Sequence, residues 1–217
     1  MPAKLKCLIL DFDGVIVESN HIKDDAFRKI LSRYPDYFSE LWQYHREHNA
    51  LDRYSKFNHF VTRIFGQENT EMTNRLAQEF GELTQTAIMS CPFVPGAEVF
   101  LESFVGRIPM HLASATPETQ LTEILQERQL TKFFKSVTGS SLPKAASIEQ
   151  IVQGAKLNVA EVLFIGDSPE DYSAAQATGI RFIARKSDRY DHQKMPEPLS
   201  DLFEVRRELE KAYDIPE

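Results

Sequence analysis

The sequence predicts an α/β fold in which a doubly wound parallel sheet is interrupted by an inserted α-helical domain. Short apolar runs recur along the chain, and segments with helical periodicity separate them. A short, continuous apolar run is typical of a strand buried on both faces, as in a parallel sheet. Residues from about 20 to 90 contain no such run but are rich in helix formers and aromatic side chains. The alternation of strands and helices therefore indicates a sheet domain, and the long helical stretch indicates a second domain inserted into it.

The predicted strands and the helices between them follow one another in a regular order. The strands are LKCLIL (5–10), IPMHLA (108–113), VLFIG (162–166) and RFIA (181–184). The connecting stretches PETQLTEILQERQL, SIEQIVQGAKL and EDYSAAQAT have helical patterns. Residues 186–200 are polar and contain two prolines, which predicts a loop, and a last helix is expected at about 201–213.

The insert is expected to be a helical bundle with an aromatic core. Because aromatic side chains mostly serve packing, we favour a core over a surface that stacks on a ligand. Two prolines and a glycine in CPFVPG (91–96) mark the return to the sheet. The predicted domains are therefore residues 1–18 with 92–217 for the sheet, and residues 19–91 for the helices. The aromatic residues in question are Tyr34, Tyr37, Phe38, Trp42, Tyr44, Tyr54, Phe57, Phe60 and Phe65.

Composition and charge narrow the classes of partner. The 217 residues carry a formal net charge of −7, and no run of five like charges occurs. A nucleic acid or an anionic membrane would need a basic face, so neither is expected as a partner. The two cysteines make no disulfide framework, and no signal-peptide pattern or long apolar span is visible. We expect a cytoplasmic protein, and a monomer because no coiled-coil heptads are apparent.

The sharpest chemical signal is the pair of carboxylates Asp11 and Asp13, which follow the first predicted strand and precede Gly14. The carboxyl edge of an open α/β sheet is where ligands bind. Two acids this close repel each other unless a cation or a proton compensates, and oxygen ligands of this kind suit Mg²⁺. The alternative is a simple turn, since Asp and Gly are ordinary turn residues.

A second acidic motif follows the strand at 162–166. Ser168 with Pro169 can begin a helix there, and an acid in the first turn, such as Asp171, complements the helix dipole. This capping role explains Asp171 well but explains Asp167 less well, because Asp167 precedes the cap. The position of Asp167 therefore favours a metal ligand from a second strand.

Two further residues lie where a phosphoryl group could bind. Ser114 follows the strand at 108–113, beside a helix start at Thr116 and Pro117, where a hydroxyl and free backbone N–H groups can bind phosphoryl oxygens. Lys144 begins a predicted helix, where a cation opposes the dipole, so local stability gives no reason for it. It could neutralise phosphate charge. A turn-making serine and a solvated lysine are the alternatives.

Taken together and in this order, these motifs resemble those of the haloacid dehalogenase superfamily, in its branch of phosphatases and phosphosugar mutases with a helical (C1-type) cap. DFDGV (11–15) matches the first motif, Ser114 the second, Lys144 the third and GDSPED (166–171) the fourth. The resemblance covers essentially the whole chain, and the insert follows DFDGV, where the family places its cap. It implies a Rossmann-like core.

The resemblance also implies roles for the motif residues. Asp11 would attack phosphorus and form an aspartyl-phosphate, while Asp13 would protonate the leaving oxygen and then activate water. Mg²⁺ would be held by the Asp11 side chain, the Asp13 backbone carbonyl and Asp167. Ser114 and Lys144 would hold the phosphoryl oxygens.

Residues outside the catalytic pair would orient the site and recognise the substrate. Asp171 would position Lys144 and water at the metal, whereas Asn20, Lys23 and Arg53 are candidate substrate contacts. The position of Arg53 is similar to that of an arginine presented from a cap loop by family members with phosphosugar substrates. It could clamp a distal carboxylate or phosphate, although a surface salt bridge is an equal alternative.

We expect a Mg²⁺-dependent phosphatase for a small phosphorylated metabolite, either a sugar phosphate or a nucleotide. A phosphosugar mutase of the β-phosphoglucomutase type is the enzymatic alternative, which Arg53 keeps open. A catalytically silent phosphate-binding module is the other alternative. Such a module would usually lack Asp11 or Asp13, and both are present.

Overall fold

The computed structural model describes residues 3–48 and 51–215 of the chain. The chain divides into two compact units, one formed by Met1–Asn20 together with Cys91–Glu217, and the other by His21–Ser90. The first unit contains both sheets, and the second contains only helices and turns among its described residues.

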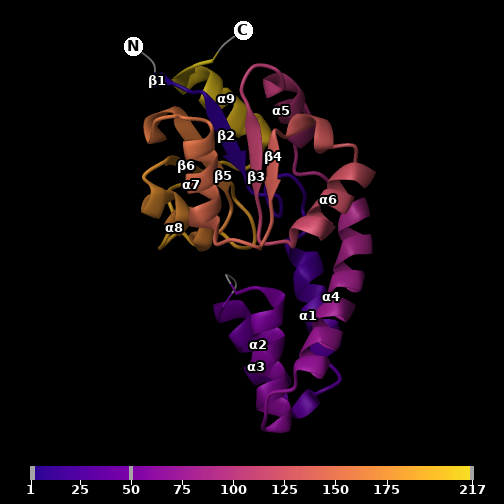
Figure 1. Ribbon diagram of the computed structural model, residues 1–217. Helices are drawn as coiled ribbons and strands as arrows, with labels where there is room; N and C mark the ends of the chain where they lie inside the picture. The colour runs from indigo at the N-terminus through magenta and orange to yellow at the C-terminus, as the bar shows by residue number, and fades with distance from the viewer. Residues whose placement is uncertain (1–2, 49–50, 216–217) are drawn as a thin grey trace. The chain divides into compact units, whose positions relative to one another are not determined.

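The first unit is built on a five-stranded sheet in which every neighbouring pair is parallel (Figure 1). Its order is β4-β3-β2-β5-β6, so the first strand of this sheet in the sequence lies in its centre. The predicted α/β fold class is thereby confirmed. In spatial order the strands are β4 (Ser136–Thr138), β3 (Met110–Ala113), β2 (Cys7–Leu10), β5 (Val162–Gly166) and β6 (Arg181–Ala184).

The apolar runs predicted four of the five strands of this sheet. Strands β5 and β6 have the predicted bounds, whereas β2 and β3 each begin two residues later than predicted. Leu5 is fully buried although it precedes β2, so burial extends beyond the ladder of hydrogen bonds. Strand β4 was not predicted, because its three residues, SVT, form no continuous apolar run. A second small sheet pairs β1 (Ala3–Lys4) with β7 (Tyr213–Asp214) in parallel.

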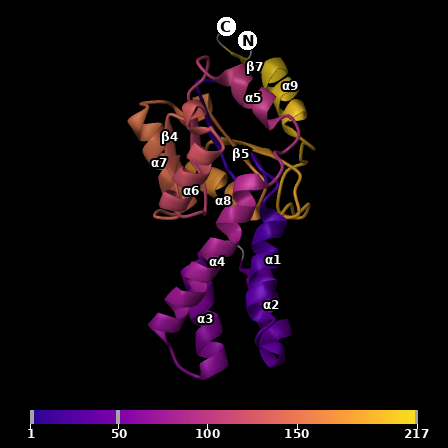
Figure 2. The ribbon, with the colours of Figure 1, turned by 90° about the vertical axis from the view of Figure 1, so that its right-hand side faces the viewer.

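Helices lie on both faces of the main sheet, as a doubly wound fold requires. One face carries α7 and α8, whose Ile148 and Ala175 pack with Ile9 and Phe164 of the sheet. Helices α5 and α9 pack against each other on the opposite side (Figure 2). The α-helices of this unit are α5 (Ala97–Phe104), α6 (Glu118–Glu127), α7 (Lys144–Gly154), α8 (Pro169–Thr178) and α9 (Leu202–Ala212).

The second unit is a helical bundle around a core of aliphatic side chains and four phenylalanines. Its helices are α1 (Asn20–Leu31), which starts at the last residue of the first unit, α2 (Phe38–Glu47), α3 (Arg53–Phe65) and α4 (Thr70–Ser90). Phe27 lies at the centre, with its ring centroid 5.2 Å from that of Phe57 and 4.4 Å from that of Phe80. Of the aromatic residues predicted for this core, Phe57 and Phe60 are fully buried, whereas Tyr54 and Phe65 are exposed.

No helix among the described residues is both long enough and apolar enough to cross a membrane. The longest, α4, has 21 residues and carries polar side chains throughout its length.

Candidate active site

Three of the predicted side chains follow directly on three adjacent strands. Asp11 comes after β2, Ser114 after β3 and Asp167 after β5. Because these strands are parallel neighbours in the order β3-β2-β5, their carboxyl ends meet at one edge of the sheet. All three side chains are buried at that edge.

Lys144 joins this group from the first residue of α7. Its ammonium nitrogen lies 2.8 Å from Asp11 Oδ2, and it also pairs with Asp171 Oδ1. Burial disfavours the charged ammonium, but the two carboxylates outweigh burial and raise the pKa of Lys144. Two buried acids therefore stabilise a lysine that opposes the helix dipole. This excludes the alternative interpretation of Lys144 as a solvated surface residue.

Asp171 serves both the helix and the site. Its Oδ2 accepts hydrogen bonds from the backbone N–H groups of Asp167 and Ser168, at 3.1 and 3.2 Å, while Oδ1 faces Lys144. Ser168 caps α8 in return by accepting from the Asp171 N–H at 3.3 Å. A methyl group on Gly166 would lie 2.4 Å from Asp171 Cβ, so only glycine lets strand and helix approach this closely. The capping role and the role toward Lys144 therefore coexist in one carboxylate.

Asp13 is held by two hydroxyl groups that sequence reasoning did not single out as its partners. Thr116 Oγ1 donates to Asp13 Oδ2 at 3.0 Å, and the Ser19 hydroxyl donates to Asp13 Oδ1. Ser19 and Thr116 are both buried. Only their positions, one at the end of the nucleophile loop and one after β3, could have suggested this contact.

The loop after β2 is tightly wound around Gly14. The carbonyl of Phe12 accepts from the N–H groups of Ile16 and Val17, at 2.9 and 3.2 Å. Gly14 has a φ of +74°, and an added Cβ would lie 1.9 Å from Asp167 Oδ2. Glycine is therefore required here both by backbone conformation and by the approach of a carboxylate from another strand.

Three buried carboxylates could hold a metal ion together. Asp11, Asp167 and Asp171 each offer an oxygen, and these oxygens lie within 4.8 Å of one another. The carboxylate of Asp13 is not part of this group, although the contribution expected from Asp13 was its backbone carbonyl. An all-oxygen, carboxylate-rich set suits a hard cation such as Mg²⁺.

The electrostatics of this group also favour a cation. Burial raises the pKa of Asp167 from an ordinary 3.8 to about 7, with a further rise from the charge of Asp171. Burial likewise raises the pKa of Asp11 well above its ordinary value; Lys144 opposes this rise, and the neighbouring carboxylates add to it. One lysine does not compensate several buried acids, and a divalent cation would favour their ionised forms. The residues present therefore fit a Mg²⁺ site.

Comparison with known proteins agrees with this arrangement. Residues 8–185 match the family model described as haloacid dehalogenase-like hydrolase, which covers most of the chain. The chain belongs to this family.

This haloacid dehalogenase-like hydrolase is similar in sequence to a phosphatase and in fold to several solved structures. A phosphoglycolate phosphatase from Pseudomonas syringae pv. tomato is 30% identical over 116 residues, which are 50% of this chain and 42% of that protein. The chain thus spans less than half the length of that relative. A HAD-type hydrolase from Bacillus subtilis, described as bound to magnesium, has a TM-score of 0.71 at 16% identity and covers 95% of this chain and 99% of its own. A candidate beta-phosphoglucomutase from Thermotoga maritima has a TM-score of 0.70 at 18% identity, with coverages of 95% and 99%. At these identities, the two structures show the fold alone.

Asn20 and Arg185 add to the site of this haloacid dehalogenase-like hydrolase in ways the sequence did not predict. Asn20, predicted as a substrate contact, donates its amide to Asp167 Oδ2 at 2.7 Å. Arg185 follows β6 and is buried. Its guanidinium donates hydrogen bonds to both carboxylate oxygens of Glu18 and to the Gly14 carbonyl, the last at 3.1 Å. Its place at a strand end was the one available signal for Arg185.

Lys23 and Arg53 belong to the helical unit. Arg53 is the first residue of α3, and its guanidinium lies 5.1 Å from the centre of the Phe80 ring. This contact gives Arg53 a packing partner within its own unit. Substrate contact by either residue stays a prediction.

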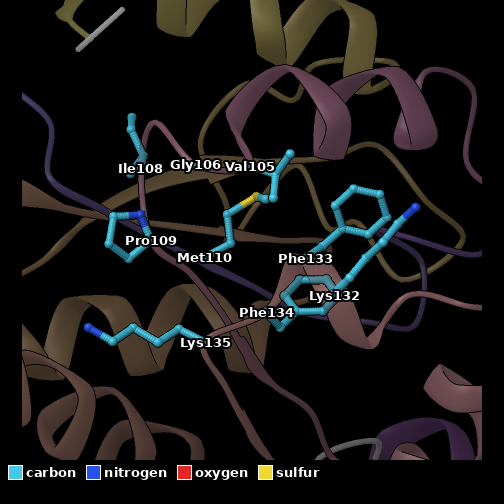
Figure 3. A pocket seen from close by; sticks show the side chains of 9 residues that line it. All are labelled: Val105, Gly106, Ile108, Pro109, Met110, Lys132, Phe133, Phe134 and Lys135. Atoms are coloured by element: carbon cyan, nitrogen blue, oxygen red, sulfur yellow. The ribbon is translucent and has the colours of Figure 1, made fainter.

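A hollow of about 280 Å³ lies elsewhere in the first unit, at the start of β3 and so away from the strand ends that carry the carboxylates (Figure 3). Its lining is largely apolar, with Lys132 and Lys135 extending outward, and it holds no carboxylate or nucleophile. The hollow therefore offers no chemistry of the kind found at the carboxyl edge. It is lined by Val105, Gly106, Ile108, Pro109, Met110, Lys132, Phe133, Phe134 and Lys135.

Proposed function

We propose that this chain is a Mg²⁺-dependent phosphatase that hydrolyses a small phosphate monoester through an aspartyl-phosphate intermediate on Asp11. The observation that carries the proposal is the Lys144 ammonium 2.8 Å from Asp11 Oδ2 and bonded to Asp171, beside the buried carboxylate of Asp167. A carboxylate held next to a fixed cation, at the edge where an α/β sheet binds ligands, is suited to attack a phosphate.

In the first step the Asp11 carboxylate attacks phosphorus in line, and the bond from phosphorus to the ester oxygen breaks. Lys144 reduces the repulsion between the nucleophile and the dianionic phosphate. Ser114 Oγ accepts from the Thr116 N–H at 3.1 Å, so its own O–H can be donated to a phosphoryl oxygen. Positioning and charge stabilisation by these side chains are what phosphoryl transfer requires.

Asp13 would act as the acid and then as the base. It gives its proton to the leaving oxygen in the first step and takes a proton from the water that attacks the acyl phosphate in the second. The hydroxyls of Ser19 and Thr116 hold its two oxygens and so restrict the orientation of the carboxylate. The second step releases inorganic phosphate and restores the Asp11 carboxylate.

Mg²⁺ would be held by the Asp11 and Asp167 carboxylates and the Asp13 backbone carbonyl, with Asp171 positioning Lys144. When bound, it would supply positive charge to offset the charge of the transferred phosphoryl group. The burial and raised pKa values of Asp11 and Asp167 support this assignment, because buried acids need a compensating cation to ionise.

The helical segment of residues 19–91 would serve as the cap that excludes water, with Lys23 and Arg53 available for substrate recognition. Phosphatase relatives support a small phosphorylated acid as one candidate substrate, in addition to sugar phosphates and nucleotides. The chain is proposed to act as a monomer on such a free metabolite.

The test is phosphate release from a panel that contains 2-phosphoglycolate, sugar phosphates and nucleotides, with and without Mg²⁺. We expect Mg²⁺-dependent release from one chemical class, and a fall of at least about 10³-fold in Asp11→Asn, because the nucleophile is lost. Asp214→Asn is the matched control, since Asp214 is exposed on β7 in the same unit and should leave turnover unchanged.

The mutase alternative rests on Arg53, whose guanidinium could clamp a second phosphate; a candidate beta-phosphoglucomutase shares the fold. It predicts that sugar phosphate isomers interconvert when a bisphosphate primer is added, with little free phosphate released. Turnover of no member of the panel, by either assay, would refute the phosphatase proposal and support a silent phosphate-binding module.

A further inference from the structure

Asn20 has a defined partner in the acidic cluster. Its amide nitrogen lies 2.7 Å from Asp167 Oδ2. A carboxylate oxygen only accepts hydrogen bonds, unless it is protonated, so the N–H₂ end of the amide must face Asp167, which determines the orientation of the amide. The two residues are 147 positions apart in the sequence, and α1 brings its first residue to the end of β5.

The contact is tightly enclosed. An added Cβ on Gly14 would lie 1.9 Å from the same Asp167 oxygen and 2.5 Å from the Asn20 amide nitrogen. The absence of a side chain at Gly14 therefore makes the space in which Asn20 and Asp167 meet. Hydrogen bonds from the Asn20 and Ser187 side chains act to lower the pKa of Asp167, against the larger effect of burial.

We propose that Asn20 is a positioning residue for the metal site and not a substrate contact. By holding one oxygen of Asp167, it keeps that carboxylate turned toward the cluster it forms with Asp11 and Asp171. The inference rests on the proposed function, because it takes Mg²⁺ as the ion held by the Asp11 and Asp167 carboxylates.

The chemistry of asparagine suits this role. An outer partner that is hydrogen-bonded to a ligating carboxylate fixes its orientation, and losing such a partner typically weakens metal affinity by about 10–100-fold. A lysine or arginine could also hold Asp167, but its charge would compete with the metal ion for the carboxylate. A neutral amide donates without adding charge, so the negative potential of the cluster is kept for the cation.

The experiment measures Mg²⁺ affinity of the purified full chain by isothermal titration calorimetry without substrate. The variants are Asn20→Ala and Asn20→Leu; the second keeps a side chain of similar size and removes the polar amide. Asn69→Ala is the control, because Asn69 also lies at a helix start, where it caps the N–H of Met72 and contacts no carboxylate in the described hydrogen bonds. Circular dichroism checks that each variant is folded.

We expect both Asn20 variants to bind Mg²⁺ about 10–100-fold more weakly than wild type, and Asn69→Ala to bind it equally. In turnover assays the loss should be recovered in part by raising the Mg²⁺ concentration, with little change in KM for the phosphate ester at saturating Mg²⁺.

Two results would overturn the inference in different ways. If the Asn20 variants bound Mg²⁺ as tightly as wild type but had a raised KM for substrate, Asn20 would be a substrate contact. The proposed function would then remain intact. A wild-type chain that does not bind Mg²⁺ would refute the metal site itself and the role of Asn20 with it.

Discussion

Replacing Gly14 with alanine perturbs the backbone and the acidic cluster at once. The residue has a φ of +74°, and the added methyl group would lie 1.9 Å from Asp167 Oδ2. Gly106 has a closely similar φ of +80°, but a Cβ added there would meet nothing within 4 Å. The two glycines lie in the same unit, so Gly106→Ala is a matched control that carries the backbone strain alone.

The expected magnitudes follow from these distances. Placing alanine in the left-handed region destabilises the folded state by about 1–2 kcal/mol, and this effect should be common to both variants. Real Cβ atoms essentially never approach another heavy atom closer than 3.0 Å, so in Gly14→Ala the Asp167 oxygen must move by about 1 Å. A displacement of this size at a reacting centre lowers the rate by about 10²-fold.

The assay compares thermal unfolding, Mg²⁺ affinity and phosphate release for both variants. We expect Gly106→Ala to lose stability only, whereas Gly14→Ala also binds Mg²⁺ more weakly and releases phosphate about 10²-fold more slowly. If Gly14→Ala retained the Mg²⁺ affinity and turnover of Gly106→Ala, the packing of Gly14 on a metal-binding Asp167 would be refuted.

Two further predictions concern buried charges. Because burial raises the pKa of Asp167 to about 7, Mg²⁺ must displace a proton at lower pH. Calorimetry should therefore show a Mg²⁺ affinity that rises between about pH 6 and 8, and an affinity independent of pH would contradict this. With a chelator present, protonated Asp167 should stabilise the folded state below about pH 4, and this stabilisation should be lost as the pH rises through 7. Glu18→Gln removes the carboxylate charge that faces the buried Arg185 guanidinium and should lower the free energy of unfolding by about 2–3 kcal/mol. Arg185→Met should lower the free energy of unfolding by less, because the Glu18 side chain that it leaves behind is 35% exposed and can be hydrated. Both losses are measured in urea titrations followed by circular dichroism, and equal losses would contradict this difference.

The sequence predicted the fold class because a buried parallel strand needs a continuous apolar run, and four such runs alternate with helical patterns. Asp11, Ser114 and Asp167 were found by the same rule, since each is the first polar residue after an apolar run. Strand β4 was not found by this rule, because its three residues, SVT, form no apolar run, whereas the other edge strand, β6, has one. Lys144 was singled out by a different argument, because a cation at a helix N-terminus is unfavourable with the helix dipole. In the structure, two carboxylate partners offset this unfavourable interaction.

Contacts between distant segments were beyond the reach of local patterns. Asn20 and Lys23 were both assigned to the substrate because they follow the nucleophile loop, yet the Asn20 amide is already bonded to a carboxylate on another strand. Arg185 reaches the loop of Gly14 from 171 residues away. Both contacts depend on strand order, which places β6 beside β5 and β5 beside β2, and no periodicity in the sequence determines that order. A polar side chain near such a motif therefore has two candidate partners, a substrate or another part of the fold, and only the position of the other strands decides between them.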